Sequence, residues 1–190
     1  METTTYTNYL DCEKTLQLIL SEWCNSIMVE IPELNIEEID KKTDNGKYRI
    51  LGQYFKCSPV KVENVVINGE LAEVSEHKPM IKLYNGGMDE QCMKHELIHH
   101  LFSIKRNRLL CSIDYMGIPS MVINNYSISK WYFKFTGIKD WLFEIIAKMD
   151  LNLRHMGYSD NNIAEERRVR QLEYKDWGSI KLWFESNKLY

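Results

Sequence analysis

Two histidines and a glutamate in the segment His95-Glu96-Leu97-Ile98-His99 have the residue types and spacing that most clearly indicate chemistry. Residues four apart on a helix project to the same side, so His95 and His99 can share one metal ion. Glu96 lies between them in angle, where it is poorly placed to ligate the same ion but can reach a water bound to it. The spacing therefore predicts a zinc site with Glu96 as general base.

The residues around this motif predict a helix over positions 88–106 that has two distinct sides. The side with metal-ligating and polar types carries Cys92, His95, Glu96, His99 and Ser103. A separate apolar side carries Met93, Leu97, Leu101 and Ile104. Such a helix has one side for the core and one for a site. The alternative is an accidental helical pair in which each histidine is hydrogen-bonded to a carboxylate.

By this motif the chain resembles the zincin metallopeptidases. In that superfamily a small sheet precedes the motif helix, and its edge strand comes just before that helix. The segment Met80 to Tyr84 stands where the resemblance implies this edge strand. An extended peptide substrate is then expected to pair with the free edge through main-chain hydrogen bonds.

A zincin needs a third protein ligand, because two imidazoles alone form a weak site. The segment from Trp141 to Ala147, WLFEIIA, is similar to the W-L-x-E-x-x-A segment of gluzincin-type peptidases. The resemblance implies that Glu144 completes the zinc site, although Ile145 stands where many members have Gly. A carboxylate in a nearly all-apolar helix is also costly unless it is bound. The alternative is that Glu144, Lys148 and His155 form the solvent face of this helix.

Glu166 is the alternative third ligand. The segment Glu166-Arg167-Arg168-Val169 has the looser E-x-x-small/apolar spacing of other gluzincin-like peptidases. The competing interpretation is that Glu165 and Glu166 complement the helix dipole and pair with Arg170. Arg167, Arg168 and Arg170, interleaved with acids, are then expected on a solvated, ion-paired helix face. His155 would give a histidine-only site, but the metzincin spacing HExxHxxGxxH is absent.

Cys92 and His100 flank the motif and have two interpretations each. Cys92 precedes His95 by three residues, so Cys92, His95 and His99 could form a structural zinc site, and a small buried thiol is the alternative. His100 lies closer to the apolar side of the helix than to the metal. We expect it to be a hydrogen-bonded, half-buried histidine.

His155 and Tyr158 are candidate donors to the oxyanion of a transition state, because they follow the Glu144 helix and carry N–H and O–H groups. The alternative places them as surface residues at a helix end. The aromatic run Trp131 to Phe135 is a candidate wall of a specificity pocket, and core packing is its alternative.

Hydrophobic periodicity predicts an α+β fold: a small N-terminal mixed sheet with a covering helix, then the HExxH helix and a mainly helical C-terminal half. We expect one zincin-like domain over residues 1–190, strand-rich over 29–84 and helix-rich over 88–190. The predicted strands are 29–34, 48–55, 62–67, 70–74 and 80–84, with a type I′ turn at Asn68-Gly69. The predicted helices outside the motif are 10–27, a buried helix over 141–156, and 163–176.

The chain has 190 residues, with 44% hydrophobic and 27% charged residues, which is typical of one globular domain. Its formal net charge of -3 argues against nucleic acid as a partner. The chain shows no membrane-span pattern and no N-terminal leader pattern, and its five cysteines form no CxxC pair. We therefore expect a cytoplasmic protein with reduced thiols.

Together these features predict a zinc metallopeptidase that acts on a peptide or protein substrate. It would hold one Zn²⁺ per chain through His95, His99 and Glu144, with Glu96 as the catalytic base. Two alternatives stay open. One is a zincin-fold regulatory protein, antirepressor-like, that acts on one specific partner. The other is a structural-zinc protein without hydrolase activity, which removal of the metal would unfold.

Overall fold

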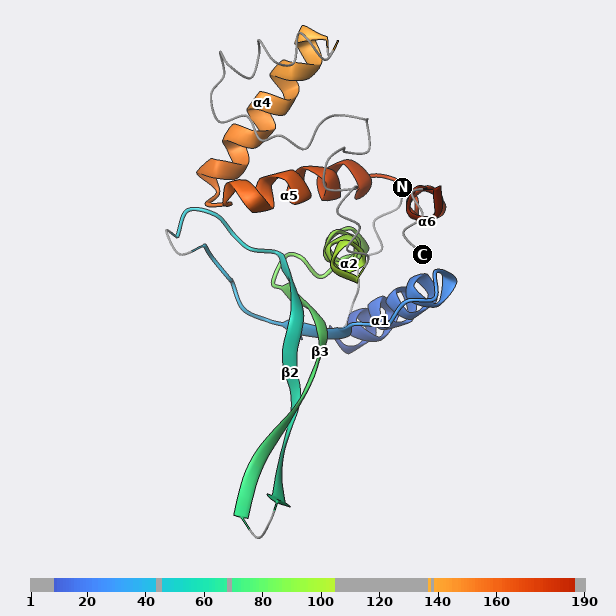
Figure 1. The fold of residues 1–190 in the computed structure, drawn as a ribbon, viewed down its shortest axis with the longest axis vertical. Coiled ribbons are helices and arrows are strands. Elements are labelled where there is room, and N and C mark those ends of the chain that lie inside the picture. Colours follow the sequence, from blue (N-terminus) through green and yellow to red (C-terminus); the bar gives the residue numbers. More distant parts are fainter. Residues whose placement is uncertain (1–8, 44–45, 68–69, 105–136, 138, 187–190) are drawn as a thin grey trace. The chain divides into compact units, whose positions relative to one another are not determined.

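The computed structural model describes residues 9–43, 46–67, 70–104, 137 and 139–186. The helices are α1 (Tyr9–Ser26), α2 (Glu90–Ile104), α4 (Asp140–His155), α5 (Asp160–Leu172) and α6 (Trp177–Ser186), and the strands are β1 (Glu33–Glu37), β2 (Gly52–Ile67) and β3 (Glu70–Tyr84). This mixed content, drawn in Figure 1, confirms the α+β class. The chain divides into two compact units, 1–41 with 49–104 and 42–48 with 105–190, and each is described by itself.

The sheet of the first unit has three strands in the order β1-β3-β2. β1 runs parallel to β3 and β2 runs antiparallel to it, which confirms a mixed sheet. Residues 52–55 of the predicted strand 48–55 and the predicted strand 62–67 fall in one long strand, β2, whereas residues 48–51 lie before it. The predicted strands 70–74 and 80–84 form one strand, β3. The register shifts on either side of Pro59, so irregularities in the ladder accommodate a residue without an N–H. The predicted turn at 68–69 lies outside the described residues.

The prediction that Met80 to Tyr84 is an edge strand is wrong, because this segment is the centre of the sheet. On one side it pairs with β1, from Glu33 opposite Met80 to Glu37 opposite Tyr84. On the other side β2 pairs with the same residues of β3. β1 begins at Glu33 rather than at the predicted 29. Both backbone edges of Met80–Tyr84 are therefore occupied, and a peptide cannot add there.

The helix that covers this sheet is α2, which packs on β2 and β3, while α1 packs against α2 (Figure 1). The apolar stripe of α1 is buried, with Leu16, Leu20 and Cys24 fully inaccessible. The predicted amphipathic helix at the N-terminus is therefore confirmed. Hydrophobic burial on one face of each helix stabilises this arrangement.

The apolar side predicted for the motif helix is largely confirmed. Met93, Leu97 and Leu101 are at most 1% exposed. Ile104, expected on the same side, is 40% exposed, because it is the last residue of α2. The core side of α2 therefore runs from Met93 to Leu101.

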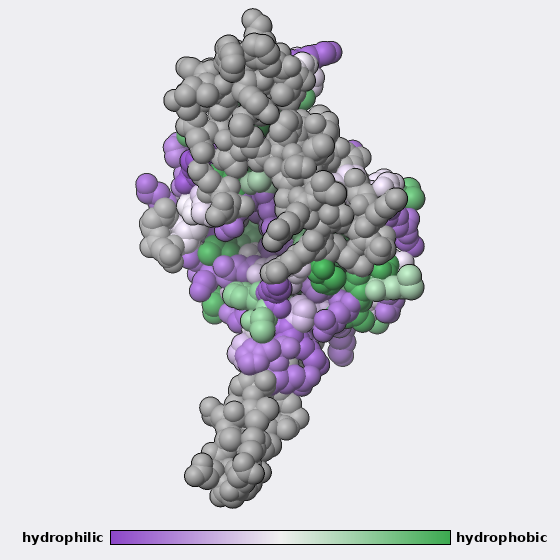
Figure 2. All heavy atoms as spheres, viewed as in Figure 1, coloured by the Kyte–Doolittle hydropathy of each residue, from purple (hydrophilic) through white to green (hydrophobic). Residues whose placement is uncertain are grey.

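A two-stranded ribbon of β2 and β3 continues beyond the part of the sheet that β1 joins (Figure 1). Figure 2 shows hydrophilic side chains gathered where the ribbon begins. Lys78 lies there 3.0 Å from Glu76 and 3.9 Å from Glu33. These exposed ion pairs mark the base of the ribbon as solvated surface.

In the second unit, α4 buries one side only, through Phe143, Ile146, Asp150 and Leu153. The prediction that residues 141–156 are buried on most sides is therefore wrong. Trp141 is 57% exposed and Leu151 is 50% exposed. α6, at Trp177–Ser186, extends the helical half past the predicted end at 176 and buries Ile180 and Phe184.

Charged side chains of α5 lie in the interior of the second unit. Arg167 and Asp150 are both fully buried, and Arg167 Nη1 donates to the two carboxylate oxygens at 2.8 and 2.9 Å. Arg168 is 3% exposed. The prediction of a solvated helix face is therefore wrong for Arg167 and Arg168, because the partner of Arg167 comes from a different helix.

Four of the cysteines, Cys12, Cys24, Cys57 and Cys92, are described and none forms a disulfide, which confirms reduced thiols for these four. Cys111 lies outside the described residues. Burial raises the pKa of Cys24 to about 12, so this thiol is inert at neutral pH. None of the described helices combines the length and apolar character that crossing a membrane requires.

We expect Asp150→Asn to destabilise the protein by about 3–5 kcal/mol, because it removes the buried carboxylate that accepts two hydrogen bonds from the Arg167 guanidinium. Urea denaturation followed by circular dichroism measures this change. The matched control is Glu185→Gln, which removes an exposed ion pair with Lys181 and should cost at most about 0.5 kcal/mol. Equal small losses in both variants would contradict a structural role for the buried pair.

Candidate metal centre

His95 and His99 lie together on one side of α2. Their ring centroids are 5.1 Å apart with an interplanar angle of 64°, and a ring nitrogen of one lies within 4.8 Å of a ring nitrogen of the other. Both side chains are half-buried. Zinc binds an imidazole nitrogen at about 2.0–2.1 Å, so two rings that project from the same side of a helix can share one ion. The predicted histidine pair is therefore present with a geometry that fits one ion.

The described part of the first unit supplies two ligands and no third. No other described His, Cys, Asp or Glu side chain of this unit has a ligand atom within 4.8 Å of the ring nitrogens of both His95 and His99. Cys92, the sulfur ligand considered in the alternative, is half-buried and is not among the candidate ligands. The described part of this unit therefore offers no candidate for the third protein ligand that the sequence analysis expects.

Glu96 is buried, with 6% of its surface exposed, and lies on the side of α2 that packs on β2. Cys92, one turn earlier, lies on the same side. The pKa of the Tyr84 phenol is raised, first by burial, then by the charge of Glu37 and, more weakly, by the charge of Glu96. Tyr84 therefore stays protonated, and its hydroxyl donates to Gln53 Oε1 at 2.8 Å.

His100 is fully buried and its ring is hydrogen-bonded on both sides. Nε2 lies 2.9 Å from the carbonyl oxygen of Glu30 and Nδ1 lies 3.2 Å from the hydroxyl of Tyr54. A carbonyl only accepts, so Nε2 carries the hydrogen. Burial lowers the pKa of His100. The predicted hydrogen-bonded histidine is confirmed, with deeper burial than expected, and it ties α2 to the segment after α1.

The hydroxyl of Tyr54 connects β2 to α2. It lies 2.7 Å from Ser103 Oγ and 3.2 Å from His100 Nδ1, and Ser103 Oγ lies 2.9 Å from the carbonyl oxygen of His100. Because Nε2 of His100 carries the hydrogen, Nδ1 accepts from the Tyr54 hydroxyl, and the one hydrogen of Ser103 goes to Tyr54 or to the His100 carbonyl. This small network fixes the C-terminal half of α2 against the strand. Buried networks of this kind rigidify an element when their members are satisfied.

We expect Tyr54→Phe to lower the free energy of unfolding by about 1–3 kcal/mol, because it removes one hydroxyl and leaves His100 and Ser103 with a lost partner. Urea denaturation monitored by circular dichroism gives the value. Tyr174→Phe is the matched control, since Tyr174 is 79% exposed and its loss should stay within about 0.5 kcal/mol. Indistinguishable variants would argue against the network.

The second unit holds the acidic candidates for a third ligand. Glu166 on α5 is 1% exposed and accepts a hydrogen bond of 2.8 Å from Arg170 Nε. The predicted i,i+4 pairing with Arg170 is therefore present. Glu165, the neighbouring acid, is exposed. Arg170 orients the Glu166 carboxylate, as hydrogen-bond partners commonly do for metal-ligating carboxylates.

Glu144 on α4 is half-buried. By helical spacing it shares the solvent-facing side of α4 with Trp141, Lys148 and His155, all of which are exposed. The environment around Glu144 is therefore more polar and more accessible than the all-apolar helix expected from the sequence. The cost of leaving a carboxylate without a metal is lower here than for Glu166.

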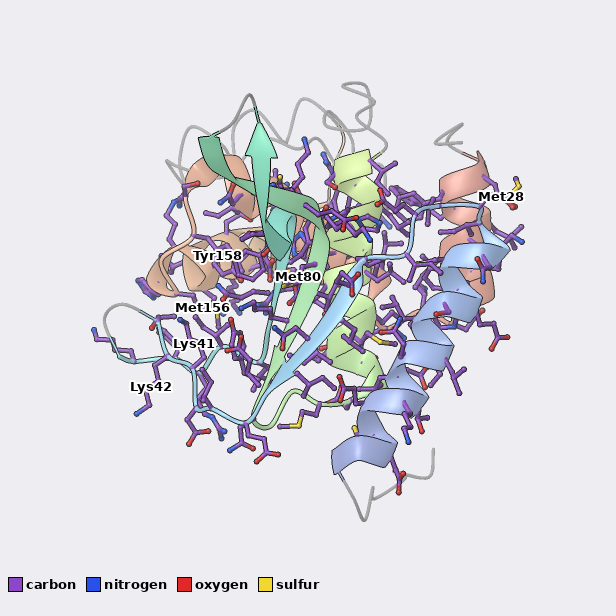
Figure 3. All side chains as sticks on the ribbon, turned by 90° about the horizontal axis from the view of Figure 1, so that it is seen from below. Met28, Lys41, Lys42, Met80, Met156 and Tyr158 are labelled. Carbon is purple, nitrogen blue, oxygen red and sulfur yellow. The ribbon has the colours of Figure 1, made fainter. Side chains whose placement is uncertain are left out.

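The two candidate donors, His155 and Tyr158, lie at the C-terminal end of α4 and just past it, next to Met156 (Figure 3). His155 is exposed, and Tyr158 is 36% exposed. Within the second unit a cavity of about 230 Å³ is lined by Tyr48, Met149, Asn152, Leu153, His155, Met156 and Arg170. The aromatic run 131–135 lies outside the described residues.

Sequence reasoning did not single out three residues that surround Glu96 and α2: Gly52, Tyr54 and Tyr84. A signal existed for Gly52, since an isolated glycine within a run of strand-forming residues often marks a close approach of another backbone or side chain. The two tyrosines gave no such signal. Their roles depend on long-range strand pairing.

Comparisons of the chain with protein-family models, with curated protein sequences and with solved structures find no match. The assignment of this centre therefore depends on its residues and their geometry.

Proposed function

We propose that the protein is a zinc-dependent metallopeptidase. The observation that carries this proposal is α2, which holds two imidazoles within reach of one ion and places a buried carboxylate next to them in the chain. A helix with His at i and i+4 and Glu at i+1 combines the metal ligands and the base of a zinc hydrolase. The rigid seat of α2 on the sheet supports the same role, because catalytic groups require fixed geometry.

We further propose that Glu166 is the third ligand. The segment Glu166-Arg167-Arg168-Val169 has the E-x-x-small/apolar spacing of gluzincin-like peptidases, which supports this choice. Glu166 is the more deeply buried of the two acids considered, and Arg170 already orients it. Glu144, favoured by the resemblance to gluzincins, has the more accessible position and serves as the comparison in the experiment below.

A zinc ion at this site would polarise the scissile carbonyl and lower the pKa of a water molecule. Glu96 accepts the proton of the attacking water and then delivers it to the departing amine. Burial of Glu96 would strengthen the electrostatic interaction between its carboxylate and the zinc ion of the proposed site. The packing of α2 holds the backbone of Glu96 in place during both proton transfers.

Glu96→Gln should leave zinc binding intact and lower peptide hydrolysis by at least about 100-fold, because it removes the base and keeps the shape of the side chain. The measurement pairs the zinc content of each protein with turnover of a quenched-fluorescent peptide library. Glu165→Gln is the control, since this acid is exposed and has no proposed role. Undiminished turnover in Glu96→Gln would overturn the proposal.

Native mass spectrometry of untagged protein should find one zinc ion per wild-type chain. His95→Ala should abolish zinc binding and Glu166→Gln should weaken it about 10- to 100-fold or more, whereas Glu144→Gln should leave it unchanged. The reverse order of the two glutamates would return Glu144 to the ligand set. A wild-type chain that takes up no added zinc would contradict the metal centre itself.

A second candidate function, recognition of one protein partner, is favoured by the ribbon of β2 and β3. Beyond the residues that pair with β1, the described part of this ribbon has only two strands. Two-stranded ribbons are marginal alone, and their backbone edges accept extended partners. Cross-linked complexes of wild type and Glu96→Gln separate the two functions: a partner cleaved only by wild type is a substrate, and one intact with both is a binding partner.

A further inference from the structure

We infer that Gly52 is a positioning residue for Glu96: the missing side chain at this strand position sets where the catalytic carboxylate points. This inference rests on the proposed peptidase function and deepens it. Gly52 is the first residue of β2 and is half-buried. It touches no reacting group in this proposal and acts only through Glu96.

The contact between Gly52 and α2 is closer than any side chain allows. A Cβ atom at residue 52 would lie 2.8 Å from Glu96 Oε1, 2.9 Å from Glu96 Cγ and 2.9 Å from Cys92 Sγ. Observed Cβ contacts are longer than these distances. The carboxylate of Glu96 therefore occupies the space that a side chain at residue 52 would need.

The strand cannot withdraw to make room. Gly52 pairs with Leu83 of the central strand, and the next backbone bond, from Tyr84 N to the carbonyl oxygen of Leu51, is 2.8 Å long. Leu83 and Tyr84 are both buried. The hydroxyl of Tyr84 also binds the side chain of Gln53. Backbone pairing on one side thus fixes Gly52 in place.

The helix cannot withdraw either. Its apolar side is closed by Met93 and Leu97, both fully inaccessible. One to two turns beyond Glu96, Tyr54 of the same strand binds His100 and Ser103. With both backbones fixed, the part that can move is the flexible end of the Glu96 side chain. A methyl group at residue 52 would therefore turn the carboxylate and leave the fold in place.

Such a displacement matters because proton transfer depends on position. A misplacement of about 1 Å in a catalytic group can cost on the order of 100-fold in rate. The atoms nearest to a Cβ at residue 52 belong to Glu96 and Cys92, not to the two imidazoles of the proposed metal site. Gly52→Ala should therefore separate zinc binding, which is kept, from catalysis, which is lost.

The first measurement uses zinc-free protein and requires no activity. Gly52→Ala should lower the urea midpoint, and the same substitution in a Cys92→Ala/Glu96→Ala background should lower it much less, because the obstructing atoms are gone. Gly178→Ala is the control, since its Cβ would meet only Asp176 Oδ1, at 3.1 Å. An equal loss for Gly52→Ala in both backgrounds would overturn the contact.

The second measurement compares kinetics on a peptide that wild type cleaves. Gly52→Ala should lower kcat by about 10- to 100-fold while KM and zinc content are kept, because the displaced carboxylate no longer reaches the proton it transfers. Full kcat would overturn the positioning role and leave the peptidase function standing. A wild-type protein without zinc and without turnover would overturn the function itself, and the catalytic meaning of Gly52 with it.

Discussion

The close packing of α2 against β2 is the constraint on which the first unit depends. Gly52 admits the side chains of Glu96 and Cys92, and Tyr54, two residues later on the same strand face, binds the next turns of the helix. One helix side thus meets the sheet, another meets apolar core, and His95 and His99 remain half-buried. A helix held on two sides has little freedom to rotate, so the orientation of its metal-ligating side follows from packing.

Local signals predicted much of this arrangement. The periodicity of α1 and α2 and the pairing of His95 with His99 follow from helical spacing, which is a local property. The position of Met80–Tyr84 at the centre of the sheet does not follow from local spacing. It depends on parallel pairing with β1, which lies more than 40 residues earlier in the sequence. The contact of Gly52 with α2 also joins residues 40 or more positions apart in the sequence, 52 with 92 and 96. Long-range structure therefore explains both the wrong edge strand and the unrecognised contact.

The second unit shows why composition misleads about burial. α5 is rich in charge, which is typical of a solvent-exposed helix, yet Glu166, Arg167 and Arg168 are buried. Burying Arg167 is possible because Asp150 of α4 supplies two oxygens to it. The partner lies 17 residues earlier on another helix, so no i,i+4 rule reveals it. Charged residues of α5 therefore lie in the interior, where Arg167 binds Asp150 and Glu166 binds Arg170.

Glu166 has to serve Arg170 and, in the proposed centre, a zinc ion. A carboxylate has two oxygens and about four lone-pair sites, so one oxygen can keep the bond to Arg170 Nε while the other binds metal. The guanidinium withdraws electron density from the ligand, which weakens its bond to zinc, but it also fixes the carboxylate and lowers the ordering cost of binding. If Glu166 is the third ligand, as proposed, the strength of its bond to Arg170 would therefore tune how tightly a zinc ion is held.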